Sequence, residues 1–141
     1  MKSNERILKW IYIYTNKIPG VLWETGQFKQ SKSFYTRRET EGSTQYWNFN
    51  LDVDAVVSSV SISSSGSRYT LQARATTNDS WTQLAYWGAN SGGSKEINNK
   101  NKFKYFQLVA AGASEVNWIS PAGNYYWSYA NNLTINYKYK K

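Results

Sequence analysis

Apolar and polar residues alternate strictly in several short stretches of this chain. In LTINYKYK, residues 133–140, every second position is aliphatic or aromatic, and the positions between are Thr, Asn or Lys. A period of two places the two sets on opposite faces of a β-strand. RYTLQARAT, residues 68–76, alternates in the same way, with Tyr69, Leu71, Ala73 and Ala75 on one face. Both segments are therefore predicted to be half-buried strands.

Three further segments are predicted to be strands, and polar turn signals lie between them. Residues 103–110 have apolar side chains on both faces, so both faces of that strand are expected to be covered. The additional predicted strands are FKYFQLVA (103–110), YWNFNLDV (46–53) and SVSIS (59–63). The turn signals are SSSGS (63–67), TTNDS (76–80), GANSGGS (88–94) and SPAGN (120–124). Several short strands at this spacing favour an antiparallel β-sandwich. Residues 3–14 fit a helix or a strand, and the alternation of Ile11 and Ile13 with Tyr12 and Tyr14 favours the strand.

Composition supports one all-β domain spanning residues 1–141. The chain has 141 residues, a length that fits one hydrophobic core, and no charge run or Gly/Ser linker divides it. It has 7 Trp and 12 Tyr, so the core must use rings with polar edges. No signal peptide and no apolar run long enough to cross a membrane is visible.

The residue inventory argues against catalysis. The chain contains no Cys and no His, which excludes disulfides, thiol chemistry and Cys-ligated zinc and removes the commonest general base. No nucleophile elbow, phosphate-binding glycine loop or zinc motif occurs. We therefore expect a protein that is not an enzyme.

The formal net charge of +8 favours anionic partners, but the basic residues are scattered. The densest clusters are Arg37–Arg38, Lys100 with Lys102 and Lys104, and Lys138 with Lys140 and Lys141. A solvated surface explains them most simply. Lysines alternating with aromatics in KFKYF and NYKYKK also leave single-stranded nucleic-acid binding open, although no nucleic-acid motif is present.

Residues 44–141 resemble the galactose-binding-like jelly roll, the group that includes discoidin-type domains and many carbohydrate-binding modules. The resemblance rests on Asp79 in a short turn, Trp81 and Leu84 after it, the strand FKYFQLVA and the closing LTINYKY. It implies a jelly-roll sandwich. It also implies a glycan-binding or structural role of the kind found in phage tail and neck proteins. Some relatives hold a structural calcium through loop carboxylates and carbonyls, and Asp52 and Asp54 could contribute to such a site here. Two alternating Asp residues do not by themselves predict a calcium site, so we expect no cofactor.

Sugar binding needs aromatic rings for the C–H faces of the sugar and planar polar groups for its hydroxyls. Loops and irregular segments of the chain combine both kinds of residue. The candidate ligand-binding residues are Trp23, Arg37, Arg38, Trp87, Asn90, Trp118, Tyr126 and Trp127. Core packing or a subunit interface is the alternative for these tryptophans, while Trp47 and Trp81 are expected in the core.

These observations predict a non-catalytic binding module of a phage virion or bacterial surface assembly. Its expected partner is a cell-surface glycan or cell-wall polymer, and its expected location is the virion, the cell surface or the extracellular space. The first alternative is a purely structural virion protein whose exposed rings are covered in a homo-oligomer or by other virion proteins. The second is a single-stranded nucleic-acid-binding protein.

Overall fold

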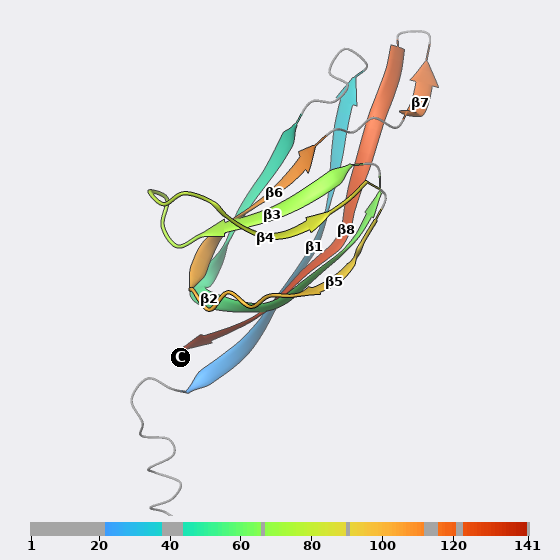
Figure 1. Ribbon diagram of the computed structural model, residues 1–141. Helices are drawn as coiled ribbons and strands as arrows, with labels where there is room; N and C mark the ends of the chain where they lie inside the picture. Colours follow the sequence, from blue (N-terminus) through green and yellow to red (C-terminus); the bar gives the residue numbers. More distant parts are fainter. Residues whose placement is uncertain are drawn as a thin grey trace, which may run out of the picture.

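The structure is a computed structural model, and it describes residues 22–37, 44–65, 67–89, 91–111, 116–120 and 123–140. These residues form eight strands and no helix (Figure 1). The strands are β1 (Trp23–Arg37), β2 (Gln45–Ser65), β3 (Arg68–Arg74), β4 (Thr82–Trp87), β5 (Gly93–Glu96), β6 (Phe103–Ala111), β7 (Val116–Ser120) and β8 (Gly123–Lys140). The all-β prediction is confirmed, and residues 3–14 lie outside the described residues.

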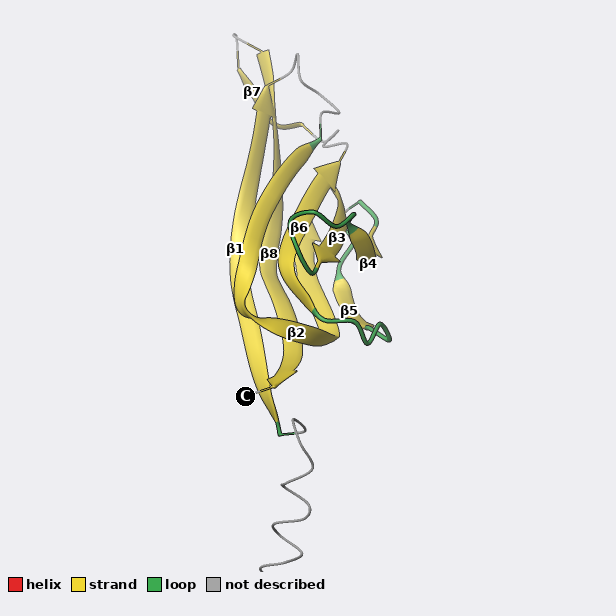
Figure 2. Ribbon diagram, turned by 90° about the vertical axis from the view of Figure 1, so that its left-hand side faces the viewer, coloured by secondary structure: helices red, strands yellow, loops and turns green. Residues whose placement is uncertain are grey.

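All strand pairs are antiparallel, and they form two layers that share β2 (Figure 2). The first half of β2, residues 45–50, pairs with β6, which continues to β3 and β4. The second half, residues 55–65, pairs with β8, which continues to β1. Figure 2 shows β2 turning from one layer into the other. A single continuous strand therefore joins the layers, where the sequence predicted two strands at 46–53 and 59–63.

Side chains from both layers meet in one core. Phe28 of β1 stacks on Phe49 of β2 with ring centroids 4.4 Å apart, and Phe34 lies 6.0 Å from Tyr69 of β3. The fully buried side chains include Trp87, Tyr69, Phe106, Leu71, Leu108, Leu133, Ile135, Val57 and Val60. The predicted antiparallel sandwich is confirmed by this packing of the two layers.

One buried hydrogen bond connects the two layers directly. The hydroxyl of Tyr69 in β3 donates to Oγ of Ser128 in β8 over 2.8 Å, and both residues are 0% exposed. Burial raises the pKa of Tyr69 to about 12. The neutral phenol is therefore the form that the fold stabilises.

The turn between β3 and β4 follows the prediction for residues 76–80. The carboxylate of Asp79 accepts hydrogen bonds from the backbone N–H of Thr76 at 3.0 Å and from its hydroxyl at 2.9 Å. The backbone N–H of Asp79 donates to the carbonyl of Thr76 over 3.2 Å. A short polar side chain that bonds to the backbone nearby is typical of such turns. This turn fixes the entry of the chain into β4 and so positions Trp81.

Candidate functional site

The outer face of the layer formed by β2, β6, β3 and β4 carries a row of side-chain amides. Cross-strand register pairs Asn48 with Gln107, Gln107 with Gln72, and Gln72 with Gln83. Residues directly opposite each other on paired strands have their side chains on the same face, with Cβ atoms about 5 Å apart. The four residues, here called the amide row, therefore cross all four strands on the side away from the core.

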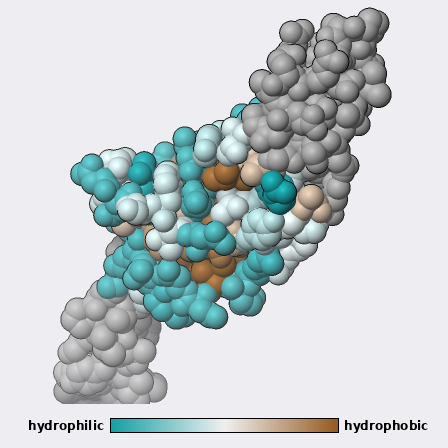
Figure 3. Space-filling model, turned by 45° about the horizontal axis from the view of Figure 1, so that its top comes forward, coloured by the Kyte–Doolittle hydropathy of each residue, from teal (hydrophilic) through white to brown (hydrophobic). Residues whose placement is uncertain are grey.

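Aromatic residues border the amide row on both sides. On one side, exposed Tyr46 and Tyr86 lie at the two ends of the next row of register partners. On the other side, Tyr105 of β6 pairs with Asn50 of β2 and with Arg74 of β3. Elsewhere, on the face seen in Figure 3, hydrophobic residues form only small patches separated by hydrophilic ones.

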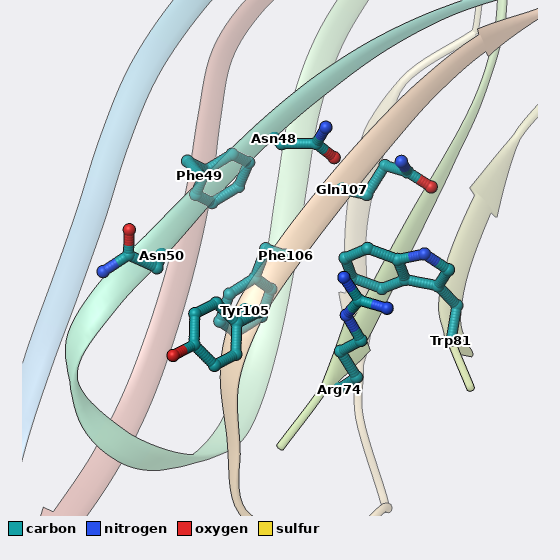
Figure 4. A pocket seen from close by; sticks show the side chains of 8 residues that line it. All are labelled: Asn48, Phe49, Asn50, Arg74, Trp81, Tyr105, Phe106 and Gln107. Atoms are coloured by element: carbon teal, nitrogen blue, oxygen red, sulfur yellow. The ribbon is translucent and has the colours of Figure 1, made fainter. Parts of the chain in front are cut away.

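A cavity of about 310 Å³ lies at the Arg74 end of this face (Figure 4). It is lined by Asn48, Phe49, Asn50, Arg74, Trp81, Tyr105, Phe106 and Gln107. Figure 4 shows the guanidinium of Arg74 beside the indole of Trp81, with the amides of Asn48 and Gln107 near each other across the cavity. The cavity thus combines planar amides, aromatic rings and one cation.

Arg74 and Trp81 hold each other in place. Cζ of Arg74 lies 4.1 Å from the centroid of the Trp81 ring, within the range of a cation–π interaction. Nη1 of Arg74 also donates to the backbone carbonyl of Asp79 over 3.2 Å. Trp81 is half-buried and lines the outer cavity. The prediction that Trp81 is a core residue is therefore wrong, because Trp81 precedes β4 and packs on Arg74 from outside the sheet.

The chemistry of this face is that of a binding surface. Each Asn or Gln amide offers a carbonyl acceptor and an N–H₂ donor in one plane, and each ring offers an apolar face. None of the described residues lining the cavity has a carboxylate. The pair of carboxylates that hydrolysis of a glycosidic bond requires is therefore not provided by this lining.

The candidate residues that the structure describes lie in different parts of the molecule. Trp23 is 41% exposed at the start of β1. Trp87 is 2% exposed, and its indole N–H donates to the carbonyl of Gly93 over 3.1 Å. A ring buried to this extent presents no face to a ligand, so Trp87 is corrected to a core residue. Arg38 and Asn90 lie outside the described residues.

The other four candidates lie in strands at the end of the sheet opposite Trp23. Arg37 and Trp118 are both register partners of Tyr125, the residue that precedes Tyr126 and Trp127. The backbone therefore brings Arg37, Trp118, Tyr126 and Trp127 together, although their side chains are not described. Fourteen residue steps along β1 separate Arg37 from Trp23, and at about 3.3 Å per residue this is about 45 Å. These two groups cannot form one site.

The sequence did not reveal the amide row, although part of its signal was present. Asn48, Gln72 and Gln107 all lie between apolar residues in segments that were predicted to be strands. The missing information was the register that places them side by side.

The described residues also bear on metal binding and on membrane insertion. Among the described residues there is no group of three or more His, Cys, Asp or Glu side chains that could hold a metal ion. Asp52 and Asp54 are exposed on β2. The described part of the chain also has no helix that is both long and apolar enough to span a membrane.

No protein-family model and no curated protein sequence matches the chain. Solved structures with a similar fold include the family 32 carbohydrate-binding module of NanJ from C. perfringens in complex with galactose. That match has 15% identity and a TM-score of 0.47, and it covers 84% of this chain and 96% of that one. An F5/8 type C domain from Bacteroides fragilis has 13% identity and a TM-score of 0.44, covering 88% and 95%.

A third similar structure is that of the infectious bursal disease virus Gt strain. It has 10% identity and a TM-score of 0.48, and the match covers 86% of this chain and 34% of the viral chain. The first two structures belong to the group of domains that residues 44–141 resemble in sequence. All three TM-scores are below 0.5, so these similarities assign no function to the chain.

Proposed function

We propose that this chain is a non-catalytic carbohydrate-binding domain that binds a neutral glycan on the outer face of β2, β6, β3 and β4. The observation that carries the proposal is the amide row formed by Asn48, Gln107, Gln72 and Gln83. Amides in register offer alternating donors and acceptors, which is what the neighbouring hydroxyls of a sugar need. The rigid sheet already fixes the backbone of all four residues, so binding has to order only their side chains.

The dimensions of the face favour a short oligosaccharide over a single sugar. Three strand spacings separate the two ends of the amide row, and at about 4.8 Å each they amount to about 14 Å. The cavity beside Arg74 and Trp81 lies at one side of the row, where a sugar ring can stack on an aromatic face. The face therefore suits a chain that lies across the strands.

We further propose, on the sequence resemblance, that the glycan belongs to a cell surface or cell-wall polymer. The domain would then serve a phage virion or a bacterial surface assembly. A purely structural virion protein is the competing function, and it predicts stable oligomers without glycan binding. A pull-down on purified cell walls, with size-exclusion chromatography of the unbound protein, distinguishes the two.

The direct test is a glycan array followed by titration calorimetry of the best neutral oligosaccharide. We expect Gln107→Ala to weaken binding about 2- to 12-fold, since one hydrogen bond contributes about 0.5–1.5 kcal/mol. Trp81→Ala should weaken it about 10-fold or more because the ring face and the Arg74 support are lost together.

Matched controls use the same residue types elsewhere. Gln30→Ala removes an exposed amide from β1, and Trp23→Ala removes a half-exposed indole from the start of β1, which belongs to the other layer. Both should leave neutral-glycan affinity unchanged. Equal losses in the controls and in the site variants, or no neutral glycan bound at all, would overturn the proposal.

A further inference from the structure

Four lysines and one tryptophan from three distant segments gather around a second cavity. It has a volume of about 460 Å³ and is lined by Trp23, Val56, Lys100, Lys102, Lys138 and Lys140. Trp23 begins β1, Lys138 and Lys140 end β8, and Lys100 and Lys102 belong to the segment between β5 and β6. This cavity, here called the lysine pocket, lies apart from the amide row, which belongs to the other layer.

The pairing of β1, β8 and β2 places four of the residues that line the lysine pocket. Trp23 is the register partner of Lys140, and Val56 is the partner of Lys138. Nζ of Lys140 lies 5.7 Å from the centroid of the Trp23 ring, which remains 41% exposed. A partly exposed indole thus lies beside several ammonium groups.

The segment that carries Lys100 and Lys102 is held by its own hydrogen bonds. The backbone N–H of Ile97, which is buried, donates to the carbonyl of Ser58 over 3.0 Å. The backbone N–H of Asn101 donates to Oδ1 of Asn99 over 2.8 Å. The first bond ties the segment to β2, and the second orders the backbone between the two lysines, so less backbone ordering is left for a ligand to impose.

All charged residues that line the lysine pocket are positive. All four lysines are exposed, and none of the described lining residues is acidic. Asp54 lies two positions before Val56 on β2 and is not part of the lining. Four cations within one cavity raise the local concentration of anions. The ligand must therefore combine negative charge with a face that can stack on Trp23.

We propose that the lysine pocket is a second binding site, which takes an acidic carbohydrate. A sugar ring bearing a carboxylate or sulfate would stack on Trp23 and place its anionic group among the lysines. Single-stranded nucleic acid is less well matched, because its binding sites present successive aromatic rings along a groove, and this cavity has one ring. A volume of about 460 Å³ also lies in the range of small-ligand sites.

The test compares charge removal inside and outside the lysine pocket. Affinities for oligogalacturonate, dextran sulfate, uncharged dextran and a dT20 oligonucleotide are measured at fixed salt, since screening weakens all exposed charge contacts. The site variant is Lys100→Gln with Lys102→Gln. The matched control is Lys29→Gln with Lys95→Gln, which changes the net charge equally at exposed residues that do not line the pocket.

We expect an acidic polysaccharide to bind and dextran not to bind at this pocket. The two acidic probes separate a carboxylate ligand from a sulfate ligand, and either one bound as described supports the proposal. The site variant should weaken acidic binding about 10-fold, which is about 1.4 kcal/mol at 25 °C. The control should change it by less than about 2-fold, because diffuse charge contributes little at physiological salt. Trp23→Ala should also weaken acidic binding, and Trp81→Ala should not.

Three results would overturn the inference. The first is that no acidic polysaccharide binds. The second is that both lysine pairs cause equal losses of affinity, which would show an effect of net charge alone. The third is that dT20 binds more tightly than both acidic polysaccharides. None of these results depends on the amide row, because neutral-glycan binding is followed separately through Gln107 and Trp81.

Discussion

The hydrogen bond between Tyr69 and Ser128 joins the two layers through buried side chains, and its contribution to stability follows from that burial. Tyr69→Phe keeps the ring but leaves the Ser128 hydroxyl without its partner at a position that is 0% exposed. An unsatisfied buried hydroxyl costs about 1–3 kcal/mol. We expect Tyr69→Phe to lower the free energy of unfolding by that amount. Ser128→Ala should lower it by no more than that amount, because the buried hydroxyl of Ser67 also lies beside the phenol.

The double variant separates the bond from other effects. When both hydroxyls are absent, neither position leaves a polar group unpaired, so the loss should be smaller than the sum of the two single losses by about 1–2 kcal/mol. Urea unfolding followed by tryptophan fluorescence gives these values, provided that the m-value stays constant. Tyr86→Phe, at an exposed tyrosine, is the matched control and should change stability by less than about 0.5 kcal/mol. Strictly additive losses would refute the claim that this bond links the layers.

Three further predictions concern the fold. Burial raises the pKa of Tyr69 to about 12 from 10.0. The contribution of the neutral phenol to the free energy of unfolding should therefore be fully present below pH 10. It should fall by about 2–3 kcal/mol as the pH rises through 12; Tyr69→Phe should reduce this fall in alkaline unfolding titrations, and an equal fall would contradict the assignment. Trp87→Phe should cost about 1–3 kcal/mol in urea unfolding through the lost volume and the lost bond to Gly93, whereas a neutral effect would show that the indole is not packed as described. Asp79→Ala should cost about 1 kcal/mol by removing both bonds from Thr76, and Asp79→Asn, which keeps an acceptor oxygen, should recover part of it.

Alternation predicted strand segments within β2, β3, β6 and β8, but it missed β1 and the continuity of β2. Trp47, Phe49 and Leu51 occupy odd positions, whereas the buried Val60 and Ile62 occupy even ones. A register shift between Val57 and Ser59 inserts one residue into the ladder. Because one extra residue moves all later side chains to the opposite face, a continuous strand looks like two separate strands in the sequence.

The same effect explains why NYYWSYANN, residues 124–132, has no clean period. The buried positions are even at Ser128 and Ala130 but odd at Leu133 and Ile135. Asn132 lies between them with a φ of 54°, a left-handed conformation that Asn tolerates better than most residues. Its backbone N–H donates to Oγ of Ser31 over 2.8 Å, where the β1–β8 register also shifts. Such an irregularity is set by contacts between strands and cannot be read from one segment.

The candidate sites were harder to predict than the fold because they depend on pairing between distant strands. The sequence shows Lys100 and Lys102 in one cluster and Lys138 and Lys140 in another, but nothing in it places them around one cavity with Trp23. Whether each tryptophan lies in the core was also predicted from its neighbours in the sequence alone. Trp81 follows a turn and precedes a strand, which is equally consistent with core packing and with its observed position on Arg74.

The central claim is that the amide row of β2, β6, β3 and β4 binds a glycan. The most direct measurement is a ¹⁵N NMR titration of the intact chain with the neutral oligosaccharide selected on the array. The side-chain amide signals of Asn48, Gln72, Gln83 and Gln107 and the indole signal of Trp81 should shift together with one affinity. Shifts confined to Trp118, Tyr126 and Trp127, with the amide row unchanged, would contradict the account and place the site at the far end of β1 and β8.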